Sequence, residues 1–131
     1  MLVGSFFKNI NPKYKSHFFS GLSFNSLNCK KGNIFFAIKG TKIDANKYIN
    51  DAIKKGAKTI ISDQKFQDIK DNILYINTTN VRKLLAEISF KVFKNKPKNI
   101  IAITGTNGKS SIADFYFQIL KLNNKNRTRL T

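Results

Sequence analysis

The chain is poor in several residue types that common kinds of site require. Its 131 residues contain one cysteine, one histidine, two prolines and no tryptophan. The single cysteine, Cys29, excludes an internal disulfide and fits a reducing compartment, and we expect it to act as a small buried hydrophobic residue. The lone histidine, His17, has no companion at metal-ligand spacing, so we expect it to be structural or exposed.

Acidic residues and long apolar runs are also scarce. Seven Asp and Glu residues stand against 24 Lys and Arg, and Glu87 is the only glutamate. The sequence therefore offers no paired carboxylates for acid–base or metal chemistry. No apolar run approaches the roughly 18 residues of a membrane span, and the N-terminus lacks the pattern of a signal peptide. We expect a cytoplasmic protein without a membrane segment.

The net charge of +17 favours anionic partners, but its distribution is diffuse. The lysines occur mostly as singles and pairs, such as Lys30-Lys31 and Lys54-Lys55. Arginine, which reads nucleic-acid bases best, is scarce. We expect most of these lysines to be solvated and expect no specific nucleic-acid binding. The positive field would still attract anionic substrates such as nucleotides.

Short apolar segments alternate with segments of helical periodicity, which predicts an α/β fold with a mainly parallel sheet. Strands are expected at residues 33–38, 58–62 and 72–76, and helices at residues 47–55 and 80–94. Asn80 is the expected cap of the second helix. Its expected buried stripe is formed by Val81, Leu84, Leu85, Ile88, Val92 and Phe93.

The two ends of the chain differ from this central pattern. Residues 1–20 are aromatic and basic, which predicts an arm with one helical turn. Residues 94–98 are polar and contain Pro97, which indicates a domain boundary. We therefore expect one small α/β domain over residues 1–96 and the beginning of a second over residues 97–131. The last residues, 123–131, are polar and basic, as in a frayed tail.

The second region contains the most informative motif, Thr104-Gly-Thr-Asn-Gly-Lys-Ser110. An expected buried strand at residues 100–103 precedes it, and an amphipathic helix of about 12 residues follows. Gly105 and Gly108 allow backbone N–H groups to approach an anion, and Lys109 adds a cation. Ser110 offers a hydroxyl to magnesium at the positive end of the helix. The alternative is an ordinary strand–turn–helix in which Lys109 is merely solvated.

A second set of residues precedes this loop in a recognisable order. The set comprises Ser26, Gly32, Phe36-Ala37, Gly40, Asp44, Tyr48-Ile49, Ala52 and Gly56-Ala57. Together with the phosphate loop, it resembles the Mur ligases, and the MurE type most closely, over about residues 20–122. Leu27 stands where that family usually has arginine, and Ala45 replaces a glycine.

The resemblance implies a small uridine-nucleotide-binding domain over residues 1–96. It also implies that residues 97–131 are the first strand, P-loop and helix of a truncated ATP-binding domain. The implied ATP site consists of Gly105, Thr106, Asn107, Gly108, Lys109, Ser110 and Ser111, with Ser110 on Mg²⁺. The implied UDP-substrate site consists of Phe24, Ser26, Thr41, Lys42 and Ile43.

The implied reaction belongs to peptidoglycan precursor synthesis. ATP would phosphorylate a carboxylate of a UDP-N-acetylmuramoyl dipeptide, and the amine of a diamino acid would displace the phosphate. No catalytic residue is assigned within the chain, since the family's general base, further metal ligands and amino-acid site are expected beyond residue 131. We therefore expect no ligation by these residues alone.

Two other interpretations remain open for the chain. One is a stand-alone, non-catalytic module that binds nucleotides or polyanions, and the other is a fragment of a MurF-type ligase. Individual residues also have structural alternatives. Ser26 could cap a turn, Phe24 could belong to the core, and Lys42 could be one more surface lysine.

Overall fold

The computed structural model describes residues 1–7, 10–95, 97 and 99–123. The chain divides into two compact units, Met1–Lys94 and Asn95–Thr131, which are described separately below. The expected tail at residues 123–131 lies outside the described residues except for Asn123. In the described part of the chain, no helix is long and apolar enough to cross a membrane.

The first unit is built on a five-stranded sheet with the strand order β1-β2-β3-β5-β4. Strands β1 (Gly21–Ser23), β2 (Asn33–Phe36), β3 (Thr59–Ser62) and β5 (Ile73–Asn77) run parallel to one another. Strand β4 (Ile69–Lys70) is antiparallel to β5. The α/β class and the mainly parallel sheet are confirmed. Sequence periodicity missed β1 and β4, because runs of two or three residues are too short to show an alternation.

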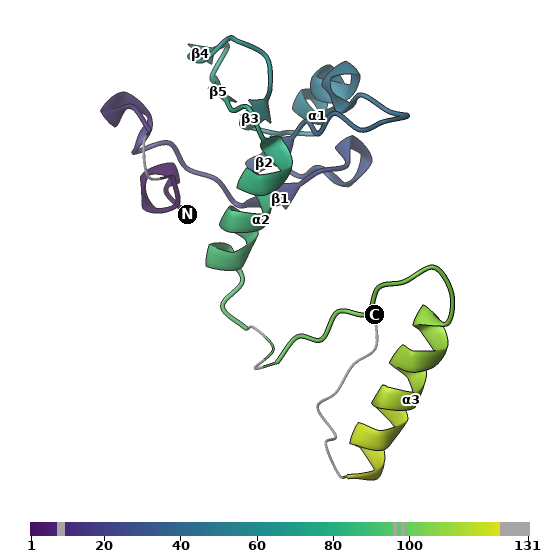
Figure 1. Cartoon of the computed structure of the whole chain (residues 1–131). Helices are drawn as coiled ribbons and strands as arrows, with labels where there is room; N and C mark the ends of the chain where they lie inside the picture. The colour runs from purple at the N-terminus through teal and green to yellow at the C-terminus, as the bar shows by residue number, and fades with distance from the viewer. Residues whose placement is uncertain (8–9, 96, 98, 124–131) are drawn as a thin grey trace. The chain divides into compact units, whose positions relative to one another are not determined.

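Short helical segments precede, connect and follow the strands of the first unit (Figure 1). They are η1 (Val3–Ser5), η2 (Pro12–Tyr14), η3 (Ser26–Asn28), η4 (Ala45–Tyr48), α1 (Ile49–Lys54) and α2 (Val81–Val92). The helix expected at residues 47–55 is thus split into a 3₁₀ turn and a short α-helix. Asp44 explains this start, because its side chain accepts a hydrogen bond from the Asn46 N–H at 2.9 Å.

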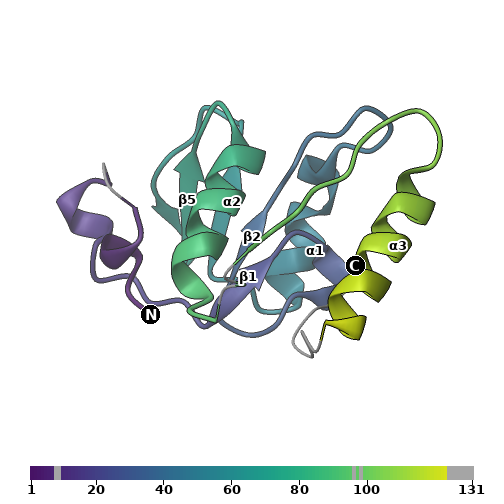
Figure 2. The ribbon, with the colours of Figure 1, turned by 60° about the horizontal axis from the view of Figure 1, so that its bottom comes forward.

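Both faces of the sheet are covered. Along β2, Ile34 and Phe36 belong to one core cluster with α2 and the N-terminal segment, whereas Phe35 belongs to a second cluster with α1. This division follows from the two-residue period of a strand. Figure 2 shows α2 lying across the sheet. A strand that is buried on both faces has a continuous apolar sequence, which is why β2 was predictable.

The N-terminal segment is more than the arm that was expected. The segment packs into the core through Val3 and Tyr14 of its two 3₁₀ turns and through Phe7 and Phe19 outside them, and all four side chains are buried. The Met1 amine donates to the Phe19 carbonyl at 2.8 Å. The aromatic content that looked like an arm is therefore part of the hydrophobic core.

Helix α2 begins as expected, because the Asn80 side chain accepts a hydrogen bond from the Lys83 N–H at 2.9 Å. Val81 and Ile88 are buried, and Leu84, Leu85 and Val92 pack at the edge of the same cluster. The assignment of Phe93 to this stripe was wrong. Phe93 lies after the last helical residue with extended backbone angles, so its side chain leaves the helical face and is exposed.

The second unit contains one regular element among its described residues, the helix α3 (Lys109–Leu122). The strand expected at residues 100–103 is absent, and Ile100 and Ile101 are exposed. A strand requires a hydrogen-bonded neighbour, and none of the described strands pairs with this segment. The expectation of a buried strand at these residues was therefore wrong.

Candidate functional site

The loop before α3 has the backbone shape that its glycines suggested. Gly108 caps the helix with a φ of +73°, in the left-handed region that favours glycine. A Cβ at Gly108 would meet nothing within 4 Å, so the backbone angle, rather than crowding, makes glycine suitable there. Helix α3 has no side-chain cap at its N-terminus, and the first N–H groups of a helix have no partner within it. This helix end can therefore accept an anion.

Lys109 closes the same loop on itself. Its ammonium donates hydrogen bonds to the carbonyl oxygens of Gly105 and of Thr106, the latter at 3.0 Å. Ser110 and Ser111 follow in the first turn of α3 and are exposed, as are Thr106 and Asn107. The structure thus brings all seven expected loop residues together around one turn. A phosphate that entered this loop would compete with the two carbonyls for the lysine.

The second group of expected residues lies on two loops that follow adjacent parallel strands. Phe24 follows β1, and Thr41, Lys42 and Ile43 follow β2. Because the two strands are parallel neighbours, their carboxyl ends meet at one edge of the sheet, where ligands of open α/β sheets usually bind. Phe24 is 67% exposed, so the alternative that it belongs to the core is wrong.

The loop after β2 is held in a defined shape. The Gly40 N–H donates to the Ile43 carbonyl at 2.8 Å, and Lys39 forms an isolated antiparallel bridge with Asp44. A Cβ on Gly40 would lie 3.0 Å from that carbonyl oxygen, so glycine allows this close approach. The three residues at the tip, 41–43, are exposed.

Ser26 differs from the other members of its group, because it is buried in the 3₁₀ turn η3. Its carbonyl accepts a hydrogen bond from the Cys29 N–H at 3.2 Å. The neighbouring Leu27, where the family usually has arginine, is exposed. The turn itself is capped by Asn25, whose side chain accepts a hydrogen bond from the Leu27 N–H at 2.9 Å. The residue that caps this turn is therefore Asn25 and not Ser26.

Sequence reasoning missed Asn46 and Asp63, which connect the loop after β2 with the end of β3. The Asn46 side-chain N–H donates to the Asp63 carboxylate at 2.9 Å. The Asn46 side-chain oxygen is buried and has no hydrogen-bond partner among the described residues. Only the spacing of Asn46 from Asp44 could have drawn attention to it, because its contact with Asp63 spans 17 positions of sequence.

The remaining polar candidates behave as structural groups. His17 makes a ring-nitrogen hydrogen bond with the Lys58 carbonyl at 3.0 Å. Cys29 is buried, as expected, and burial raises the pKa of its thiol. Across the described ranges, no three His, Cys, Asp or Glu residues gather as metal ligands. Ser110 could therefore bind a metal ion only together with ligands from elsewhere, such as the phosphates of a bound nucleotide.

The sequence of the first unit matches a model of a known protein family. The model described as "Mur ligase family, catalytic domain" matches residues 19–92, more than half of the chain. The chain belongs to the Mur ligase family. This match covers the sheet of the first unit, from the segment before β1 to the end of α2, and so includes both loops that follow β1 and β2.

Similar curated Mur ligases are of the MurE type. The chain is 41% identical over 79 residues to UDP-N-acetylmuramoyl-L-alanyl-D-glutamate--2,6-diaminopimelate ligase of Rickettsia prowazekii. It is 43% identical over 67 residues to the ligase of the same name from Clostridium tetani. The alignments cover 60% and 50% of this chain but 16% and 14% of those ligases. The expected resemblance to the N-terminal portion of MurE-type ligases is confirmed.

A solved structure supports the same fold. The MurF ligase of Thermotoga maritima in complex with ADP matches with a TM-score of 0.58 and 25% identity. The match covers 76% of this chain and 23% of that ligase. The chain therefore has the architecture of the corresponding part of a Mur ligase and spans less than a quarter of the relatives' length.

Proposed function

We propose that this chain supplies the substrate-binding beginning of a MurE-type ligase. Its first unit would bind the uridine nucleotide of a UDP-N-acetylmuramoyl dipeptide, and its phosphate loop would bind ATP. The observation that carries the proposal is the placement of Phe24 and residues 41–43 at the carboxyl ends of adjacent parallel strands in a Mur ligase chain. An exposed aromatic ring, a hydroxyl and a cation there suit a base and a pyrophosphate.

The phosphate loop would contribute positioning and charge neutralisation rather than covalent chemistry. Lys109 would leave the loop carbonyls and contact the phosphates, and the free N–H groups of α3 would bind the same oxygens. Ser110 would hold Mg²⁺, which would supply positive charge that offsets the charge of the phosphates. The ADP complex of the Thermotoga maritima MurF ligase makes an adenine nucleotide the natural ligand to test.

The later steps require groups that these residues do not provide. Attack of an amine on an acyl phosphate needs a base or orienting group and a site that excludes water. We propose that the incoming amino acid is a diamino acid, as in the names of the relatives. We also propose that the chain works in the cytoplasm and shows no turnover by itself.

Calorimetry with UDP-N-acetylmuramoyl-L-alanyl-D-glutamate tests the first site. We expect weak binding that Lys42→Ala reduces by about 1.5–3 kcal/mol, the usual worth of a hydrogen bond to a charged group. Phe24→Ala should also weaken binding, through lost ring contact. The matched control is Lys54→Ala, an exposed lysine on α1. Equal affinity of the Lys42 and Lys54 variants would remove the loop after β2 from the site.

Titration with Mg²⁺–ATP tests the second site. We expect weak, salt-sensitive binding, because the contacts rest largely on charge. Lys109→Ala should abolish it, whereas Lys121→Ala, at the other end of the same helix, should not. If both variants bind ATP as well as the unaltered chain does, the phosphate-loop assignment is wrong.

A MurF-type fragment is the second candidate, because the MurF structure aligns with 76% of the chain. The higher identities to MurE-type ligases, 41% and 43%, favour the MurE type. A stand-alone polyanion-binding module is the third interpretation. It would bind inorganic polyphosphate as tightly as the uridine nucleotide, and the same calorimetric measurement distinguishes it.

A further inference from the structure

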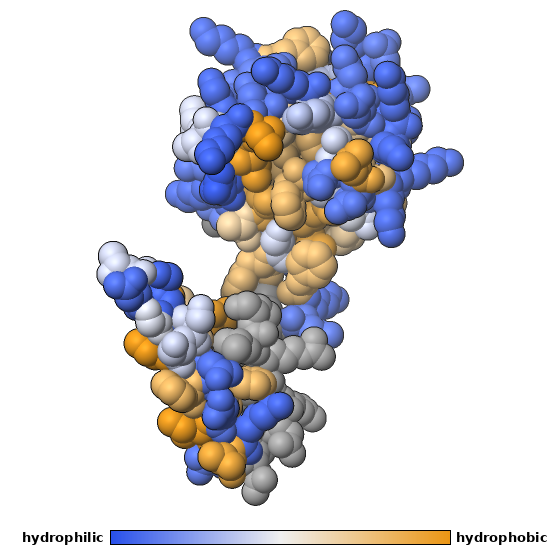
Figure 3. All heavy atoms as spheres, turned by 90° about the vertical axis from the view of Figure 1, so that its right-hand side faces the viewer, coloured by the Kyte–Doolittle hydropathy of each residue, from blue (hydrophilic) through white to orange (hydrophobic). Residues whose placement is uncertain are grey.

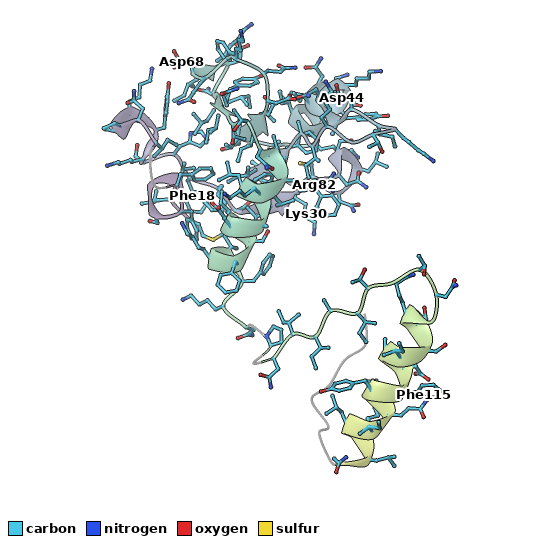
Figure 4. The ribbon with its side chains drawn as sticks, viewed as in Figure 1. Phe18, Lys30, Asp44, Asp68, Arg82 and Phe115 are labelled. Atoms are coloured by element: carbon cyan, nitrogen blue, oxygen red, sulfur yellow. The ribbon has the colours of Figure 1, made fainter. Side chains whose placement is uncertain are left out.

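Asn46 links the loop after β2 to the neighbouring strand β3. It is the second residue of η4, which begins directly after the loop. Its backbone N–H donates to the carboxylate of Asp44, labelled in Figure 4, at 2.9 Å. Its side-chain N–H donates to the carboxylate of Asp63, the residue after β3, at 2.9 Å. Because β2 and β3 are parallel neighbours, this pair joins two loops at the carboxyl edge of the sheet.

The orientation of the Asn46 amide leaves its oxygen without a partner. A carboxylate can only accept hydrogen bonds, so the amide nitrogen must face Asp63. The Asn46 Oδ1 atom is then buried, and no donor from the described part of the chain reaches it. A buried acceptor without a partner costs free energy. Asparagine is therefore a poor choice for stability at this position, and proteins break such rules mainly at functional sites.

The contact fixes the position of a loop whose shape is already set by other bonds. The Gly40 N–H donates to the Ile43 carbonyl, and Lys39 bridges Asp44. These contacts join parts of the loop to one another. The hydrogen bond from Asn46 instead joins the far end of the loop to a different strand. A binding loop that is held at both ends loses less conformational freedom when a ligand binds.

The burial of Asn46 indicates that it acts through the loop and not on the ligand. Its side chain is half-buried and its Oδ1 atom is buried, whereas residues 41–43 at the tip are exposed. We propose that Asn46 is a positioning residue, which holds residues 41–43, through Asp63, in the shape that accepts the diphosphate of the UDP-linked substrate. The inference rests on the proposed function for its ligand, but the ordering of the loop can be measured without one.

The chain offers matched controls for both members of the pair. Figure 3 shows hydrophilic residues around a smaller apolar area on the first unit. Asp63 and Asp51, which lies on α1, are both exposed, so water can solvate either carboxylate whether or not it has a partner. Asp51 is therefore a charge-matched control for Asp63. Asn50, also exposed on α1, is the control for Asn46.

The first experiment separates positioning from stability. Asn46→Ala removes the bond to Asp63 and the unpartnered oxygen together, so the melting temperature should not fall. Hydrogen exchange at residues 40–46 should become at least about tenfold faster, because the loop loses its anchor. Calorimetry should show at least about fivefold weaker binding of UDP-N-acetylmuramoyl-L-alanyl-D-glutamate. Asn50→Ala should change neither exchange nor binding. A lower melting temperature with unchanged exchange and binding would mean that Asn46 is merely structural.

The second experiment separates the hydrogen bond from the charge. Asn46→Asp places a carboxylate against Asp63 and should weaken binding at least about tenfold, through repulsion and the lost donor. Adding Asp63→Asn restores one donor and one acceptor with their roles exchanged. Exchange and affinity should then return to within about threefold of the unaltered chain. Adding Asp51→Asn instead restores the same net charge without the bond and should rescue neither.

The outcomes distinguish this inference from the proposed function. If the unaltered chain binds the UDP-linked dipeptide and the Asp63→Asn and Asp51→Asn double variants bind it equally, the positioning role is wrong and the proposed function stands. If the unaltered chain does not bind the dipeptide, the proposed function fails, and exchange at residues 40–46 decides the role of Asn46. Unchanged exchange in Asn46→Ala would overturn the inference, and faster exchange that only Asp63→Asn rescues in Asn46→Asp would support it.

Discussion

The two units contain the same local arrangement, an apolar run, a short loop and an amphipathic helix, with different outcomes. In the first unit, Ile73–Asn77 forms β5 beside β3, and α2 buries Val81 and Ile88. In the second unit, residues 100–103 form no strand and α3 buries no residue. Helix formation is local and occurs in both units, whereas a strand and a buried face need a partner. The difference shows which features of an α/β unit depend on its neighbours.

The largest expected contrast is in hydrogen exchange. Amides of β2 and β3 should exchange through global unfolding, because these strands lie inside a sheet that is covered on both faces. Amides of α3 should exchange through local opening, at least about 1,000-fold faster relative to their intrinsic rates. Mass spectrometry of peptides covering residues 33–38 and 110–122 measures both. Equal protection of the two segments would show that α3 is held by contacts that we have not identified.

A matched pair of aromatic truncations gives the next largest effect. Phe36 lies on β2 and is fully buried in the core cluster that includes α2. Phe115, in contrast, is exposed on α3. Phe36→Ala should lower the free energy of unfolding by about 3–5 kcal/mol, through lost burial and a residual cavity. Phe115→Ala should change it by less than about 0.5 kcal/mol. Urea denaturation checks both values, and similar losses for the two variants would contradict the comparison.

Each unit contains a glycine with a positive φ whose replacement by alanine should have a different effect on the stability of the first unit. Gly56 has a φ of +102°, and a Cβ there would lie 2.8 Å from the Lys31 Cα. Gly56→Ala should therefore destabilise the first unit by about 2–3 kcal/mol, from backbone strain and the clash. Gly108→Ala adds strain alone, since nothing lies within 4 Å of its Cβ position. The unfolding midpoint of the first unit should not move in the Gly108 variant, and a shift there would show energetic coupling between the units.

The smallest expected effect concerns Asp68, labelled in Figure 4. It accepts hydrogen bonds from the Lys13 ammonium at 3.0 Å, the Ile69 N–H at 2.7 Å and the Tyr14 hydroxyl at 3.1 Å. The Lys13 hydrogen bond is the main reason that the pKa of Asp68 lies below its ordinary value of 3.8. The stabilisation is therefore complete above that value and is lost as the pH falls below it.

Thermal unfolding between pH 7 and pH 3 tests this effect. The difference in melting temperature between the unaltered chain and Asp68→Asn should be small, because the pair is exposed, and should shrink toward pH 3. Asp114→Asn is the control, since the Asp114 carboxylate accepts from Gln118 within α3. A difference that stays constant over the whole range would show that the charge of Asp68 does not stabilise the first unit.

The sequence by itself determined the features that depend on local pattern. The apolar runs of β2, β3 and β5, the Asn80 cap and the glycine turn at Gly108 follow from side-chain period, side-chain hydrogen bonding and backbone freedom. The order of the motif residues was also sufficient to identify the Mur ligase resemblance. These inferences required no knowledge of which segments are neighbours in space.

Only the tertiary structure decided the features that depend on neighbours. It placed the aromatic N-terminal segment in the core, left Phe24 exposed and Ser26 buried, and joined Asn46 to Asp63. It also showed that residues 100–103 form no strand, although their sequence is as apolar as that of β3. The physical reason is the same in each case, because burial and strand pairing are properties of two surfaces in contact, and a sequence pattern specifies only one of them.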